Sequence, residues 1–234
     1  MHRAIDASAR PFEVIVGSPR ARFGARITFF IAESSASRVV HELGLESHPW
    51  GAPSWVGLRV NAKGEIDWKA YHAARDVPLP LDVPPGLPSP LTPVMAALHQ
   101  GRCEIYYRLR TKMPWEAFVA PCVQLVDGEM PASRLHISPT AGAFCLSIAR
   151  EGRVVRAVSV FADDRALPAE PESSRQWREA LPAADRAAYD VALAGVRSTG
   201  RRPARGWHAM YAWTSSDDGS QSRAVSLRIA LAEP

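Results

Sequence analysis

Hydrophobic and polar residues alternate along many short segments of this chain, and tight turns join most of the segments in pairs. Successive side chains of a β-strand point to opposite faces, so this alternation predicts strands with one apolar and one polar face. Lys63-Gly64, Asp127-Gly128, Glu151-Gly152 and Asp218-Gly219 supply the glycine that tight hairpin turns favour. We predict five hairpins, with strand pairs at 12–16 and 22–32, 55–62 and 65–73, 118–126 and 132–138, 144–149 and 154–161, and 207–214 and 223–231. A further strand is predicted at 103–110.

Apolar residues with helical spacing occupy three other segments. They predict helices at 37–45 and 90–100, and one or two helices within 173–197, while the proline-rich segment 77–93 reads as an extended connector. About ten antiparallel strands usually curl or close, because closure removes exposed sheet edges. If helices cover the apolar faces, the polar faces point inward. We therefore predict one domain spanning 1–234 with an α+β fold: a single antiparallel β-barrel of about ten strands, surrounded by helices and with a polar lumen.

Composition narrows the class of protein. The formal charge of +4 comes without a dense basic patch or a nucleic-acid reading motif, so we expect no nucleic-acid partner. No apolar run is long enough to span a membrane, and the first residues lack the apolar stretch of a secretory signal. Cys103, Cys122 and Cys145 cannot pair completely and form no metal-binding spacing. These features favour a cytoplasmic protein with reduced cysteines and no membrane partner.

Several candidate site residues share the polar strand faces. The cations are Arg26, Lys69, Arg134 and Arg228, the ring-bearing residues are Tyr71, Tyr106 and His136, and Glu13 is the acid. Converging Arg and Lys side chains bind multiply charged anions, Arg through a bidentate fork and Lys as a point charge. Arg156 is left out because it shares a face with Val154 and Val158. The alternative for every one of these residues is an ordinary solvated or half-buried position on a sheet.

Three stretches of the chain carry a resemblance to a known family. They are 25–33, the pair 57–61 and 68–72, and 104–106 together with the closing hairpin 207–231. In these stretches the chain resembles the ABBA-barrel prenyltransferases, and within them most closely the cyanobactin-type peptide prenyltransferases. The chain departs from the family in being shorter, which suggests a missing or trimmed N-terminal portion. It also has Ser159, Ser226 and Arg228 where the family tends to have Lys, Arg or Tyr.

The resemblance implies a role for each candidate residue. Arg26, Lys69, Arg134 and Arg228 would bind an isoprenyl diphosphate, Tyr71, Tyr106 and His136 would shield the allylic cation, and Glu13 would take the proton released on alkylation. No protein-built metal site is expected, because the histidines are scattered along the chain. Asp163-Asp164 and Asp217-Asp218 lack the third acid of an Asp-Asp-x-x-Asp box, which argues against the all-helical terpenoid synthases. Mg²⁺ would bind, if at all, through the diphosphate.

The function implied is transfer of a dimethylallyl or geranyl group from its diphosphate to an aromatic small molecule or a peptide side chain. The alternative is a non-catalytic β-barrel protein that binds an anionic or amphipathic small molecule. A family member that has lost activity is a third reading, because its last strands are poor in tyrosine.

Overall fold

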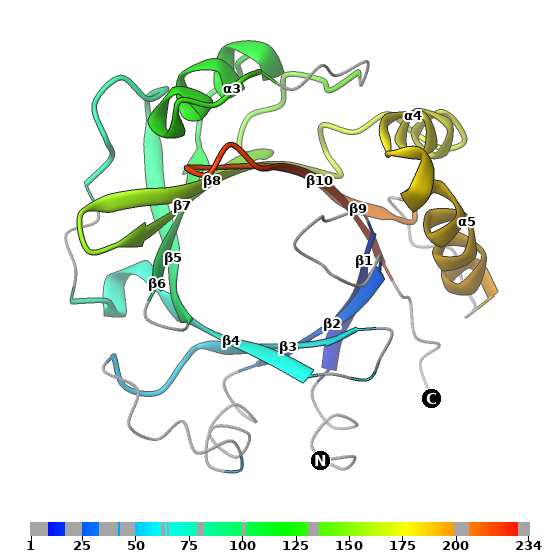
Figure 1. Cartoon of the computed structure of the whole chain (residues 1–234), viewed down its shortest axis with the longest axis horizontal. Helices are drawn as coiled ribbons and strands as arrows, with labels where there is room; N and C mark the ends of the chain where they lie inside the picture. The colour runs from blue at the N-terminus through cyan, green and yellow to red at the C-terminus, as the bar shows by residue number, and fades with distance from the viewer. Residues whose placement is uncertain are drawn as a thin grey trace.

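Ten antiparallel strands close into a barrel in this computed structural model (Figure 1), which describes residues 9–16, 25–32, 42, 50–61, 64, 66–78, 82–99, 102–130, 136–198 and 206–228. Around the barrel the strands follow the order β1-β10-β9-β8-β7-β6-β5-β4-β3-β2, so each strand pairs with its neighbours in sequence and β1 pairs with β10. The strands are β1 Ala9–Val16, β2 Ala25–Ala32, β3 Trp55–Asn61, β4 Ile66–Ala73, β5 Leu91–His99, β6 Arg102–Leu109, β7 Phe144–Glu151, β8 Val154–Asp163, β9 His208–Ser216 and β10 Gln221–Arg228. The predicted closed α+β barrel is confirmed.

Among the described residues, the α-helices that lie outside the barrel in Figure 1 are α3 Trp115–Val123, α4 Glu172–Ala180 and α5 Ala183–Ser198. Two short 3-10 turns, η1 Ala74–Asp76 and η2 Gln124–Val126, follow β4 and α3. None of the helices in the described ranges has both the length and the apolar character needed to cross a membrane.

The main hydrophobic core fills the space between the helices and the outer face of the barrel. Trp115 of α3 packs edge-on against Phe144 of β7, with ring centroids 5.2 Å apart, and Trp177 of α4 lies 4.8 Å from Tyr211 of β9. All four rings are at most 1% exposed. Because the apolar strand faces are used outward in this way, the polar faces are left to line the lumen, as the sequence predicts.

Two predicted elements are wrong, and the strand predicted at 132–138 is not formed at 136–138, the part of it that the structure describes. The segment 90–100 forms strand β5 and not a helix, with Pro93 beside a register shift, where a strand tolerates proline. The segment 118–126 forms the end of α3 and η2 and not a strand. Asp127 adopts a left-handed conformation and the Gly128 amide donates to the Val123 carbonyl, so Asp-Gly ends a helix here and does not turn a hairpin. The predicted helix 37–45 lies almost wholly outside the described residues.

A buried polar cluster joins α4 and α5 to the start of β9. Tyr189 and His208 share a 2.8 Å hydrogen bond at Nε2, and the His208 Nδ1 lies 3.3 Å from the Ser173 hydroxyl and 3.2 Å from the Glu170 carboxylate. Burial, assisted by the Arg197 guanidinium, lowers the pKa of His208 to about 4, although the adjacent carboxylate favours the protonated ring. The cluster therefore holds the two helices to the barrel through a neutral histidine.

Candidate active site

The lumen side of the barrel is defined by strand register, because residues paired across neighbouring strands lie on the same face. Each residue paired with Lys69 on the next strand has its own partner on the strand after that, and these pairs can be traced strand by strand around the whole barrel. The trace takes every second residue of each strand and ends on the same face of β4 as it began, so all these positions form one set. Described members of this set include Lys69, Tyr71, Glu104, Tyr106, Arg108, Ser147, Ser159, Phe161, Thr214 and Ser226. The set is rich in cations, phenols and hydroxyls.

The centre of the site is an ion pair inside the barrel. Lys69 on β4 is only 5% exposed, and its ammonium group bonds the Glu104 carboxylate on β6. The same ammonium donates to the Tyr106 hydroxyl at 2.8 Å. Two strands separated by β5 thus bring a cation, an acid and a phenol together.

Two tyrosine rings cover Lys69. Its Nζ lies 5.5 Å from the ring centroid of Tyr71 and 5.3 Å from that of Tyr106, and the two rings are 6.0 Å apart. Phe161 of β8 extends this aromatic surface, 6.3 Å from Tyr106. Aromatic faces at these distances attract cations by about 0.5–2 kcal/mol each. The structure therefore brings together the predicted Lys69, Tyr71 and Tyr106.

Glu104 is fully ionised in this setting. Burial alone would raise the pKa of its carboxyl group, but the Lys69 charge and hydrogen bonds from Lys69, Ser147 and Tyr106 lower that pKa to about 2. Smaller polar groups continue this surface on β8 and β9, where the Ser159 and Thr214 hydroxyls lie 2.8 Å apart.

Arg108 is a second lumen cation. It occupies the same face of β6 as Tyr106 and pairs in register with Cys145 of β7. Its Nε is buried and has no hydrogen-bond partner among the described residues. The same guanidinium group forms a side-chain hydrogen bond with Cys145, and a guanidinium on the lumen face is a group that can bind an anion.

Glu13 and Arg26 lie on strands for which the structure describes the backbone. Glu13 is paired with Arg228 and Thr28, and Arg26 is paired with Ile15 and Asn61. Both occupy register positions in the same alternating set as Lys69. Their roles as base and diphosphate ligand remain predictions.

Arg228 stands near one end of the barrel and already has a partner. Its Nη1 lies 2.8 Å from the Asp164 carboxylate, and its side chain is 27% exposed. It is therefore a cation near the mouth and is partly neutralised. Arg156, which the parity argument left out, is paired with Glu151 and Asp217 away from the lumen set.

The predicted pair Arg134 and His136 does not form part of the described lumen. Arg134 lies outside the described residues. His136 is exposed in an irregular segment, and its amide donates to Gln176 of α4, so placing it on a barrel strand is wrong. The error follows from taking 118–126 and 132–138 as a hairpin.

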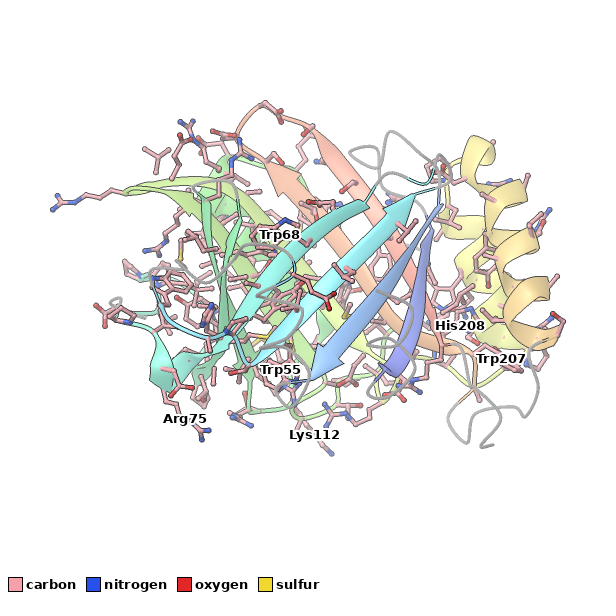
Figure 2. The ribbon with its side chains drawn as sticks, turned by 90° about the horizontal axis from the view of Figure 1, so that it is seen from below. Trp55, Trp68, Arg75, Lys112, Trp207 and His208 are labelled. Carbon is pink, nitrogen blue, oxygen red and sulfur yellow. The ribbon has the colours of Figure 1, made fainter. Side chains whose placement is uncertain are left out.

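Three site residues were missed at the sequence level. Glu104 and Arg108 flank Tyr106 at two-residue spacing, which by itself indicates a shared strand face. Trp55 at the start of β3 pairs with Tyr71 and is 41% exposed, near the barrel end that also carries Arg75 and Lys112 in Figure 2. Alternation alone could have found all three, but only the register shows which face they share.

Solved prenyltransferase structures share this fold. The PriB binary complex with product diphosphate matches at 14% identity and a TM-score of 0.64, covering 93% of this chain and 79% of that chain. The 5-dimethylallyl tryptophan synthase from Streptomyces coelicolor in complex with DMASPP and Trp matches at 12% identity and 0.59, covering 96% and 80%. NotF prenyltransferase matches at 10% identity and 0.56, covering 94% and 81%.

No sequence-family model matches the chain, and no curated protein matches it. At identities of 10–14% the structural likeness shows the fold alone. The chain thus has the barrel fold of these prenyltransferases, which confirms the architecture expected from the resemblance.

Proposed function

We propose that this protein transfers a dimethylallyl or geranyl group from its diphosphate to an aromatic small molecule or to a peptide side chain. The observation that carries the proposal is Lys69, a buried cation inside a closed barrel, covered by the rings of Tyr71 and Tyr106. The named prenyltransferases with the same fold, one in complex with diphosphate and another with DMASPP and Trp, support it.

The proposed reaction divides among the lumen residues. Lys69 and Arg108, joined by Arg26 and near the mouth by Arg228, bind the diphosphate and stabilise its charge as the allylic carbon–oxygen bond breaks. Tyr71 and Tyr106 attract the allyl cation and exclude water from it. The acceptor ring attacks the cation, and Glu13 takes the proton that the acceptor loses. Mg²⁺, where used, is bound through the diphosphate.

The donor site can be tested without knowing the acceptor. Thiolo-diphosphate analogues with five- and ten-carbon chains are titrated calorimetrically into the wild type, the variant Lys69→Ala and the control Lys112→Ala. We expect binding in the wild type and the control and its loss in Lys69→Ala, with the tighter analogue giving the preferred chain length. Absence of binding to the wild type, with and without Mg²⁺, would refute prenyl transfer.

The base is tested by Glu13→Gln. Analogue affinity should remain unchanged, whereas turnover with tryptophan, tyrosine or peptides containing them should fall by roughly 10²–10⁴, the range for loss of general base catalysis. Unchanged turnover would remove Glu13 from the mechanism.

A non-catalytic binding protein is the second candidate, and one observation favours it. The buried cation Lys69 is already neutralised by Glu104, so the lumen presents less net positive charge than its cations suggest. A binding protein would take up the analogue without ever releasing diphosphate from the true donor.

A further inference from the structure

Glu104 competes with any anion for Lys69. The ammonium group is 5% exposed and has two hydrogen-bond partners in the described part of the barrel, the Glu104 carboxylate and the Tyr106 hydroxyl. A diphosphate that binds Lys69 must therefore displace Glu104 or lie beside it. Two like charges at contact distance in a partly dehydrated lumen repel strongly.

A displaced Glu104 would lose its counter-ion. The residues that share its face on the neighbouring strands are Lys69 and Tyr71 of β4 and Tyr106 and the exposed Arg102 of β6. On β5 these positions are Ala97 and His99, the latter paired with Arg102, and β7 contributes Ala149 and the Ser147 hydroxyl. Once Lys69 is engaged by the ligand, no other buried cation in this described set remains next to the carboxylate. A carboxylate that is only 19% exposed and has lost its cationic partner is destabilised, and protonation removes that cost.

We propose that Glu104 enters the donor complex as a neutral carboxylic acid, so that binding of a prenyl diphosphate is coupled to uptake of a proton from solvent. The proton adds to a carboxylate oxygen, and the resulting O–H donates a hydrogen bond to a phosphate oxygen while Lys69 pairs with the diphosphate. When diphosphate leaves, Glu104 returns the proton to solvent and pairs with Lys69 again. No covalent bond of the donor is involved in this step.

This inference rests on the proposed function, and it means that Glu104 weakens binding of the prenyl diphosphate. Replacing the Glu104 carboxylate should therefore strengthen that binding. Glutamine in place of Glu104 keeps the shape and an N–H donor, but it removes both the repulsion and the need for a proton. The Glu104→Gln variant should bind the analogue at least about tenfold more tightly than the wild type at pH 7.5.

The experiment measures proton uptake directly. The thiolo-diphosphate analogue is titrated into the wild type, Glu104→Gln and the surface control Glu116→Gln, in buffers of different ionisation enthalpy, at pH 6.0 and 7.5, with and without Mg²⁺. The wild type and the control should take up a proton beyond any uptake by the diphosphate, and their affinity should weaken as pH rises. Titration of the diphosphate is common to all three proteins, so the difference between wild type and Glu104→Gln reports the carboxyl group.

The outcomes separate this inference from the proposed function. Analogue binding by the wild type, with the same proton uptake and affinity in Glu104→Gln, overturns the coupling and leaves the donor site in place. A strict Mg²⁺ requirement in the wild type without proton uptake also overturns it, because a divalent ion would then neutralise the carboxylate. No binding by the wild type refutes the proposed function itself. Wild-type binding with a proton uptake that Glu104→Gln lacks, together with tighter binding by that variant, supports the coupling. Thermal unfolding of each variant confirms that the barrel is intact.

Discussion

Removing one partner of the Lys69–Glu104 pair should lower the free energy of unfolding by several kcal/mol. The two side chains are 7% and 19% exposed, so solvent screens them little. Lowering the pKa of Glu104 from 4.5 to about 2 corresponds to about 3 kcal/mol in favour of the ionised, paired form. This energy is close to the cost of about 3–5 kcal/mol that is typical when one partner of a buried ion pair is removed.

The perturbation is a double-mutant cycle with Lys69→Met, Glu104→Gln and the double variant, followed by urea unfolding at pH 7. We expect Lys69→Met to lower the free energy of unfolding by about 3 kcal/mol, because it leaves a buried carboxylate unpaired. The double variant should lose less than the sum of the single losses, because neither charge then remains.

The stabilisation from the same pair should also depend on pH. The folded pKa of Glu104 lies below its unfolded value, so in the wild type this contribution is complete above pH 4.5 and is lost as pH falls towards 2. In Lys69→Met the buried acid is relieved by protonation, so the gap from the wild type should narrow as pH falls. The exposed pair Arg156–Glu151 is the matched control and should show almost no coupling. Additive single losses at the lumen pair, within about 0.5 kcal/mol, would refute the reasoning.

Three further predictions concern other parts of the barrel. His208 is buried and its pKa is lowered to about 4, so the unfolded chain binds a proton at this residue more readily than the folded protein does. The free energy of unfolding should therefore fall by up to about 3 kcal/mol as pH drops from 6.5 to 4. Urea unfolding at several pH values should show this dependence, and His208→Asn should remove it. Gly128→Ala would place a Cβ 2.5 Å from the Ser215 hydroxyl oxygen and should lower the free energy of unfolding by about 1–3 kcal/mol. Gly195→Ala, in open space on α5, should raise that free energy by up to about 1 kcal/mol. Thermal unfolding of both variants tests the contrast, and an equal effect would contradict it. If the protein transfers a prenyl group as proposed, Trp55→Ala should raise the KM for an aromatic acceptor several-fold and leave donor-analogue affinity unchanged, because its 41% exposed ring offers a stacking surface beside Tyr71. Steady-state kinetics showing the reverse would place Trp55 at the donor end.

The hairpins could be predicted because their signals are local. In β3–β4 and β7–β8 the turn glycine and the alternating residues are contiguous in sequence, so backbone preference and burial agree. In the segment 90–100 the apolar pattern does not distinguish helix from strand, because Val94, Met95 and Leu98 fit either. Pairing with β4 and β6 makes this segment a strand. The run 118–126 is apolar on every side, and such a run does not distinguish a buried helix from a buried strand.

The candidate site was predictable only in part for the same reason. Parity places Lys69 and Tyr71 on one face from neighbouring positions. The contact between Lys69 and Glu104 depends on the register of β4, β5 and β6, across 35 residues. No property of either segment alone states that register, so the acid beside the lysine becomes visible only in the folded barrel.

The pairing of β1 with β10, which closes the barrel, has a consequence for the order of folding. Lys69, Glu104 and Tyr106 belong to β4 and β6, which only β5 separates, and can meet in an open sheet, whereas Glu13 and Arg228 meet only when almost the whole chain has been brought round. We therefore expect the surroundings of Lys69 to form before the barrel closes. Substitutions that loosen the β1–β10 pairing should leave the Lys69 part of the donor site in place and divert the proposed reaction from transfer to hydrolysis of the donor.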